Sequence, residues 1–308
     1  MLQRTFEERV GKQKGRQGKG TIYVWAGGNG REYHDNGNYD GYANNKYTIA
    51  IGAINDAGRV SYYSEPCACL MAVAPSSGRN RHRGISTTDL TGPNGYSSGA
   101  CTNRFGGTSS AAPLASGIVA LVLQQRPDLT WRDVQHVIAH GATKVDTHHR
   151  DWSHNRRGYS HHHDYGFGNL VIPRLLDVAK SHTLVPKQRQ CSSGRHNAHA
   201  QIPYHTRIGF GSCTLSFVEH VELHLSWSHT RHGQVVISVH SPERVTSRLS
   251  ELRHDYHRGN KHWTFSSVRH WGESLASKAT FALDVDDATP HDHYKGNVLW
   301  YEMTVYGY

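Results

Sequence analysis

One serine in this sequence stands where a reactive hydroxyl would be presented. Ser109 follows Gly106-Gly107-Thr108 and opens an apolar stretch. At a helix N-terminus, unpaired N–H groups and the helix dipole favour developing negative charge. Upstream, Asn29 lies in a second glycine turn, where its carboxamide can donate a hydrogen bond to an oxyanion. The two residues predict an acyl-transfer site with Ser109 as nucleophile. Simpler roles stay open, because Ser109 or Ser110 could be a small packing residue and Asn29 a turn residue.

The segments around these residues predict an α/β domain. The β-branched and aromatic runs Thr21–Ala26 and Tyr47–Ala53 lack alternation, as expected for parallel strands that are covered on both faces. The composition of Ala111–Gln125 predicts a helix with Pro113 in its first turn. The run Thr130-Trp131-Arg132-Asp133 resembles a capping box that opens the next helix.

From about Lys187 the pattern changes to short strands. The runs Val221–Trp227 and Gln234–Val239 alternate with period two, and Leu299–Tyr306 would form the last strand. This pattern, with turns about every ten residues, is typical of an antiparallel β-sandwich. We therefore expect one domain over residues 1–186 and a second over residues 187–308.

The composition fits a polar, β-rich globular protein. Of 308 residues, 36% are hydrophobic, 31 are Gly and 16 are Tyr, and the mean hydropathy is −0.64. The net charge of +9 would allow contact with a polyanion at the basic clusters Lys12–Lys19 and Arg79–Arg83. Neither cluster is interleaved with aromatic residues, so solvated loops explain them better, and we expect no nucleic-acid partner.

Histidines and cysteines could serve other purposes. The clusters His148-His149 and His161-His162-His163 could bind a transition metal, although an exposed His-rich loop is the simpler interpretation. The five cysteines do not have zinc-finger spacing. No apolar run approaches the ~18 residues that a membrane-spanning helix needs, so we expect membrane contact only through segments outside this chain.

Several motifs give the chain a resemblance to a known family. They include Asp40-Gly41-Tyr42-Ala43-Asn44, Tyr63-Ser64-Glu65-Pro66-Cys67, Gly107-Thr108-Ser109 and Tyr165-Gly166-Phe167-Gly168, and later Trp271-Gly272-Glu273. With them the chain resembles the proprotein convertases of the subtilisin/kexin group, which include furin and kexin. The resemblance implies the C-terminal half of a subtilisin-like parallel-sheet domain. A jelly-roll-like P (Homo B) domain would follow it, as in this family alone among subtilases.

The resemblance also implies roles for individual residues. Ser109 would be the nucleophile and Asn29 the oxyanion donor. Asp35 and Glu65 match two carboxylates that hold a Ca²⁺ ion beneath the specificity pocket, and hard oxygen ligands suit that ion. Asp40 matches an acidic residue that lines the pocket and would select basic side chains. A purely structural role in an Asx-rich turn remains open for Asp35 and Asp40.

The cysteines depart in part from the family pattern. Gly37 stands where convertases usually have a cysteine, so Cys67 would be free or form a new bond. Cys101 would pair with a residue upstream of Met1. Cys191 and Cys213 match a disulfide of the P domain, whose loop closure would contribute ~3 kcal/mol.

The resemblance predicts a calcium-dependent serine endopeptidase of the secretory pathway that cleaves precursor proteins after basic residues. A serine nucleophile needs a histidine base and an orienting carboxylate, which precede the oxyanion asparagine in this family. No Asp precedes Asp35 and no His precedes His34. We therefore expect a fragment that lacks the catalytic Asp and His and is inactive alone, or alternatively a binding or inhibitory fragment. The sequence indicates neither an oligomeric state nor the exact precursors.

Overall fold

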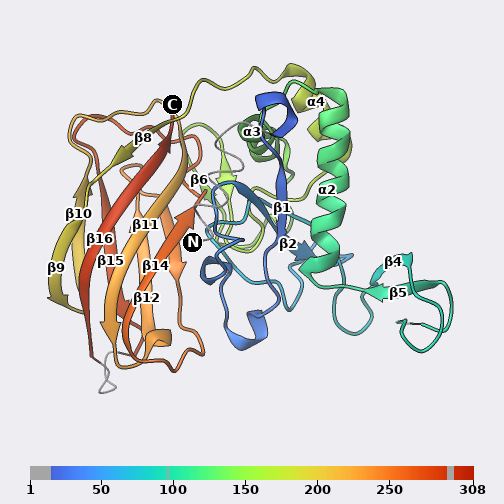
Figure 1. Ribbon diagram of the computed structural model, residues 1–308, viewed down its shortest axis with the longest axis horizontal. Helices are drawn as coiled ribbons and strands as arrows, with labels where there is room; N and C mark the ends of the chain where they lie inside the picture. The colour runs from blue at the N-terminus through green and yellow to red at the C-terminus, as the bar shows by residue number, and fades with distance from the viewer. Residues whose placement is uncertain (1–14, 96, 290–294) are drawn as a thin grey trace.

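A computed structural model describes residues 15–95, 97–289 and 295–308 (Figure 1). The start of the basic cluster Lys12–Lys19 lies outside the described residues. Among these residues, no helix has the length and apolar character needed to cross a membrane.

A three-stranded parallel sheet forms the centre of the first part. Its strands are β1 (Tyr23–Ala26), β2 (Thr48–Ile54) and β3 (Ala72–Pro75), in the order β1-β2-β3. Every residue of β2 is buried, because helices and loops cover both faces of the sheet. The predicted parallel pairing of the first two runs is confirmed.

Three α-helices accompany the sheet: α2 (Thr108–Gln125), α3 (Trp131–Gly141) and α4 (Ile172–Ser181). Helix α2 runs along the sheet (Figure 1). It begins at Thr108 rather than Ala111, so the placement of Pro113 in the first turn was wrong. Gly107 caps the helix with φ +78°, a conformation that glycine adopts without strain. The capping box at the start of α3 is present, with Thr130 and Asp133 exchanging hydrogen bonds.

Shorter elements connect these helices and strands. They are the 3₁₀ turns Gly15–Gly18, Arg31–Tyr33 and Gly37–Tyr39, and the hairpins of β4 (Ile85–Thr88) with β5 (Cys101–Phe105) and of β6 (Ser153–His154) with β7 (Ser160–His161). The β4–β5 hairpin projects away from the body of the molecule (Figure 1).

The second part is an antiparallel β-sandwich, as the alternating runs predicted. One sheet has the order β14-β11-β16-β8, with β9 also pairing with β16, and the other has the order β10-β15-β12-β13. The strands are β8 (Arg189–Ser192), β9 (His196–Gln201), β10 (Tyr204–Gly209), β11 (Val218–His229), β12 (Val235–His240), β13 (Thr246–Ser250), β14 (Gly259–Ser267), β15 (Thr280–Asp287) and β16 (Gly296–Gly307), with a 3₁₀ turn at His232–Gln234. Helix α4 ends at Ser181 and β8 begins at Arg189, and 186/187 stays our proposed domain boundary.

The two parts pack together through buried charged groups. The guanidinium of Arg132 on α3 donates two hydrogen bonds to the carboxylate of Glu219 on β11, at 3.1 and 2.5 Å. His136 lies 2.8 Å from the same carboxylate. Burial alone would raise the pKa of Glu219, but His136 and Arg132 outweigh burial and lower it to about 2. Glu219 is therefore an anion that joins the sandwich to α3.

Candidate active site

Asn29 and the start of α2 meet at the end of strand β1. The backbone N–H of Thr108 donates to Oδ1 of Asn29 at 2.8 Å, and the Thr108 hydroxyl lies 3.0 Å from the same oxygen. The N–H of Gly28 donates to that hydroxyl at 3.2 Å. These contacts hold the carboxamide by its oxygen, so its NH₂ group stays available as a donor beside Ser109.

The two adjacent serines have opposite environments. Ser109 is exposed at the second residue of α2, where the unpaired N–H groups of the helix lie. Ser110 is buried and bonds to Oγ of Ser76 at 2.6 Å and to the carbonyl of Gly107 at 3.1 Å. Ser110 therefore fills the packing role, and the hydroxyl of Ser109 is left open to a substrate.

Pro113 removes one intrahelical hydrogen bond from Ser109. Proline has no N–H, so it cannot donate the usual intrahelical hydrogen bond to the carbonyl four residues earlier, which is that of Ser109. Within the described part of the chain, the Ser109 hydroxyl has no hydrogen bond to a histidine. The described residues therefore place an exposed serine at the helix start that also holds the Asn29 carboxamide, with no histidine bonded to that serine.

Asp35 and Glu65 converge beneath the glycine turn that holds Asn29. Glu65 is 8% exposed and accepts a hydrogen bond from the N–H of Gly30 at 2.7 Å. A Cβ at Gly30 would lie 2.8 Å from Cβ of Asp35 and 2.9 Å from Oε1 of Glu65. Only glycine permits this close approach of the two acidic side chains.

The acidic pair is suited to a hard cation. Burial, together with the charges of Asp35 and Asp40, raises the pKa of Glu65 to about 7, although the N–H of Gly30 acts in the opposite direction. A bound cation would offset this repulsion, and carboxylate oxygens are ligands that Ca²⁺ prefers. The carboxylates of Asp35 and Glu65 therefore have the donor chemistry that a calcium ion requires, and the guanidinium of Arg253 already bonds to Asp35.

Asp40 has a structural role in its own turn. Its Oδ1 accepts hydrogen bonds from the N–H groups of Tyr42 at 2.7 Å and Ala43 at 2.9 Å. The side chain is exposed, and Oδ2 has no hydrogen bond among the described residues. One oxygen thus shapes the turn while the other can face a ligand.

Arg253, which the sequence analysis did not single out, reaches this acidic region from the sandwich. Its guanidinium donates to Oδ1 of Asp35 at 2.8 Å and lies 3.8 Å from the ring centroid of Tyr39. It also lies 3.5 Å from Oδ2 of Asp255. Arg253 stands 218 positions from Asp35 in the sequence, and no local pattern predicts such a contact.

The cysteines form two bonds. Cys191 bonds to Cys213, and Cys67 bonds to Cys69, so Cys67 forms a new bond with its near neighbour. A Cβ at Gly37 would lie 3.3 Å from Cβ of Cys67, close to the spacing of a disulfide. A cysteine at position 37 could therefore reach Cys67. Because position 37 is a glycine, Cys67 bonds to Cys69 instead. Cys101 is free and exposed.

The expectation of an exposed loop at His161–His163 was wrong. These three side chains are at most 2% exposed, because Leu70, Arg248 and Arg269 pack around them. His162 lies 2.7 Å from His149, and Asp164 completes a possible metal-ligand group. However, the N–H of Asp164 donates to Nδ1 of His162, so the neutral ring carries its proton on Nε2, the atom that faces His149. This arrangement satisfies His162 without a metal.

Comparison with known proteins assigns both parts of the chain. Residues 3–168 match the subtilase family, and residues 218–302 match the proprotein convertase P-domain. The chain is 38% identical to proprotein convertase subtilisin/kexin type 7 of Mus musculus over 96% of this chain and 40% of that protein. It is 34% identical to furin of Rattus norvegicus over 96% of this chain and 37% of that protein. The chain thus spans about 40% of the length of these relatives.

The fold has a counterpart among solved structures. The serine protease of Aeromonas sobria matches with a TM-score of 0.87 over 100% of this chain and 68% of that chain, at 22% sequence identity. This likeness supports the predicted fold class, an α/β subtilisin-like part followed by an all-β sandwich. The chain therefore belongs to the subtilase family of serine peptidases, in its proprotein convertase, furin-like branch, with a P-domain after the peptidase part.

Proposed function

We propose that this chain is part of a calcium-dependent serine endopeptidase that cleaves precursor proteins after basic residues. Ser109 is the nucleophile, and the NH₂ group of Asn29 stabilises the oxyanion that forms when Ser109 attacks a peptide carbonyl. The observation that carries the proposal is the pair of Thr108 contacts to Oδ1 of Asn29, at 2.8 and 3.0 Å. They fix the carboxamide at the helix end that presents Ser109.

Turnover needs groups that the described site does not provide. A general base must take the Ser109 proton, and a carboxylate must orient that base. We propose that both come from residues outside these 308, so that the 308-residue chain alone does not turn over substrate. The same absence supports the alternative function, an inactive binding or inhibitory fragment.

We propose Asp40 as the residue that recognises the basic side chain of the substrate. Its Oδ2 is unused within the described residues, and a carboxylate binds a guanidinium through directed hydrogen bonds. Asp35 and Glu65 would hold Ca²⁺ nearby. When bound, the ion supplies positive charge that keeps the buried Glu65 ionised and the two carboxylates fixed.

The relatives support a setting in the secretory pathway, where precursor proteins are the substrates. The two disulfides, Cys67–Cys69 and Cys191–Cys213, agree with such a setting, because disulfides persist in oxidising compartments. Contact with a membrane would require segments outside this chain.

The test uses the natural protein that contains this sequence, with Arg-Arg and Ala-Ala peptides as substrates. We expect cleavage of the Arg-Arg peptide, no cleavage with Ser109→Ala, and a loss in kcat of about 10²–10³ with Asn29→Ala, the range known for the oxyanion asparagine of subtilisin. The 308-residue chain alone should be inactive. Cleavage of both peptides at equal rates would contradict the specificity, and full activity of the Ser109→Ala variant would contradict the mechanism.

If the natural protein cleaves neither peptide, the alternative takes over. The inactive chain should then bind the Arg-Arg peptide, and Asp40→Asn should weaken that binding. Isothermal titration of the Arg-Arg peptide into the 308-residue chain and into its Asp40→Asn variant measures the two affinities.

A further inference from the structure

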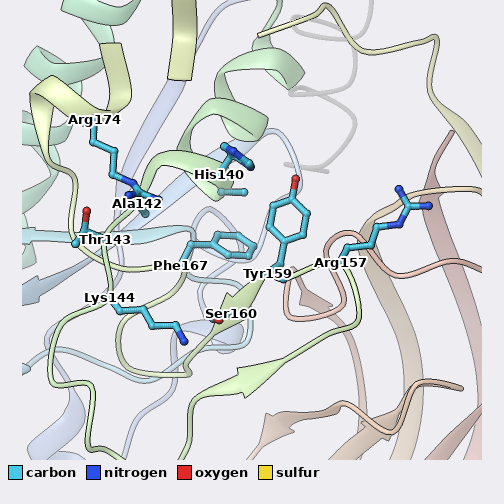
Figure 2. A pocket seen from close by; sticks show the side chains of 11 residues that line it. His140, Ala142, Thr143, Lys144, Arg157, Tyr159, Ser160, Phe167 and Arg174 are labelled. Carbon is cyan, nitrogen blue, oxygen red and sulfur yellow. The ribbon is translucent and has the colours of Figure 1, made fainter. Parts of the chain in front are cut away.

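A cavity of about 330 Å³ lies outside the peptidase site, at the C-terminal end of α3 (Figure 2). Its walls come from the segment after α3, the turn before β7 and the first turn of α4. None of the residues assigned to the peptidase site lines it. Its volume lies at the small end of the range for organic ligands.

The charged side chains that line this cavity are all basic. Lys144, Arg157 and Arg174 come from three separate segments, and no aspartate or glutamate lines the cavity among the described residues. Figure 2 shows Lys144, Arg174 and His140 on different sides of the ring of Phe167, while the side chain of Arg157 extends beyond Tyr159 and away from them. Arg157 and Arg174 are exposed and Lys144 is half-buried, and basic side chains around one cavity without a counter-ion favour an anionic ligand.

The contacts of these cations are with neutral groups. Nζ of Lys144 lies 3.3 Å from both ring nitrogens of His154 and 5.3 Å from the ring centroid of Trp152. Arg157 donates to the carbonyl of Ser216 at 2.7 Å. Arg174 forms no hydrogen bond or ion pair within the described part of the chain. The positive charge of the cavity is therefore not neutralised by the protein.

Two groups at one end of the cavity have lowered pKa values. Burial lowers the pKa of Lys144, and burial together with Lys144 lowers that of His154. The carbonyl end of α3 also faces this region, but it contributes only about half an elementary negative charge. Two full cations beside Phe167 outweigh it.

The uncharged residues that line the cavity indicate what the rest of the ligand contains. The rings of Tyr159 and Phe167 form an apolar wall, and the hydroxyls of Thr143 and Ser160 provide polar contacts. We propose that this cavity binds a compact organic sulfate or phosphate ester, such as a sugar sulfate or sugar phosphate. The oxyanion lies between Lys144 and Arg174, and the carbon skeleton packs on the aromatic wall.

The test is isothermal titration of the full 308-residue chain with glucose 6-phosphate, glucose 6-sulfate, inorganic phosphate and glucose. We expect saturable binding of the two esters, weaker binding of inorganic phosphate and none of glucose. The double variant Lys144→Gln/Arg174→Gln should lower ester affinity by at least about tenfold. The matched control Lys180→Gln/Arg207→Gln removes the same charges from exposed positions and should keep the affinity within about twofold.

Several results would overturn the proposal. If both double variants lower the ester affinity equally, overall charge alone accounts for the binding. A lack of saturable binding of either ester up to about 10 mM would also rule out the site. Binding of inorganic phosphate as tight as that of the esters would also overturn it, because the aromatic wall would then contribute nothing to the affinity. Circular dichroism and the thermal midpoint of each variant separate loss of binding from loss of fold.

Discussion

Mild acid should destabilise this protein because three buried histidines are neutral in the fold. His162, His163 and His220 are at most 2% exposed. Burial lowers the pKa of His162 and His220 to about 3 and that of His163 to about 4, although Asp151 or Glu219 acts in the opposite direction on each.

Hydrogen bonds agree with the neutral state of two of these rings. The N–H of Arg248 donates to Nε2 of His163 at 3.0 Å, and the N–H of Asp164 donates to Nδ1 of His162 at 2.9 Å. Each nitrogen must act as an acceptor, so a proton there would break the bond and oppose a backbone N–H.

The sign and size follow from proton linkage. In the unfolded chain these rings take up protons near pH 6.5, whereas in the fold they do so only near pH 3 to 4. The unfolded state thus binds more protons as the pH falls between these limits, and the free energy of unfolding decreases. Between pH 7 and pH 5 the loss is about 2 kcal/mol for each ring and about 5 to 6 kcal/mol for the three. That is a large share of the 5–15 kcal/mol typical of whole proteins.

Urea unfolding of the 308-residue chain near pH 7 and pH 5 measures this loss. We expect His163→Gln to reduce the pH dependence by about 2 kcal/mol, because glutamine can accept the bond from Arg248 but does not titrate. His205→Gln is the control: His205 is exposed, and Asp284 raises its pKa, so this substitution should not reduce acid sensitivity. A difference below about 1 kcal/mol between the two pH values, or unchanged pH dependence in His163→Gln, would show that these histidines do not set the acid sensitivity.

Three further predictions concern the site and the contact between the two parts. Thr108→Val removes one hydrogen bond to Asn29, so kcat of the natural protein should fall about five- to tenfold with KM unchanged; a change in KM alone would count against the orienting role of Thr108. Glu219→Ala leaves Arg132 buried without its partner and should cost about 3–5 kcal/mol in urea unfolding; a loss below about 1 kcal/mol would show that the pair is dispensable. Ca²⁺ should raise the thermal midpoint of the chain, and Glu65→Gln should abolish most of that rise, whereas an unchanged rise would place the ion elsewhere.

The sequence predicted those helices and strands that depend on interactions between neighbouring residues. The β-branched runs became β1 and β2, and the Thr130–Asp133 box opened α3, because strand propensity and capping depend on neighbouring residues. The start of α2 was missed because Gly107 caps the helix ahead of the apolar residues. Alternation in the second half predicted the sandwich, since period two follows from strand geometry.

Contacts between distant segments could not be predicted in the same way. The pairing of Arg253 with Asp35 depends on how the sandwich packs against the peptidase part. The burial of His161–His163 depends on Arg248 and Arg269, which also come from the sandwich. The Thr108 contacts to Asn29 join segments 79 positions apart. The Gly107-Thr108-Ser109 motif predicted a role for Ser109 but not the role of Thr108 in holding Asn29.

Labelling of the natural protein with diisopropyl fluorophosphate, followed by peptide mass mapping, identifies the reactive serine. A serine activated beside an oxyanion donor should take up one phosphoryl group. We expect this group on Ser109, and slower labelling in the Asn29→Ala variant. A phosphoryl group on another residue, or no label in protein that cleaves the Arg-Arg peptide, would show that Ser109 is not the nucleophile.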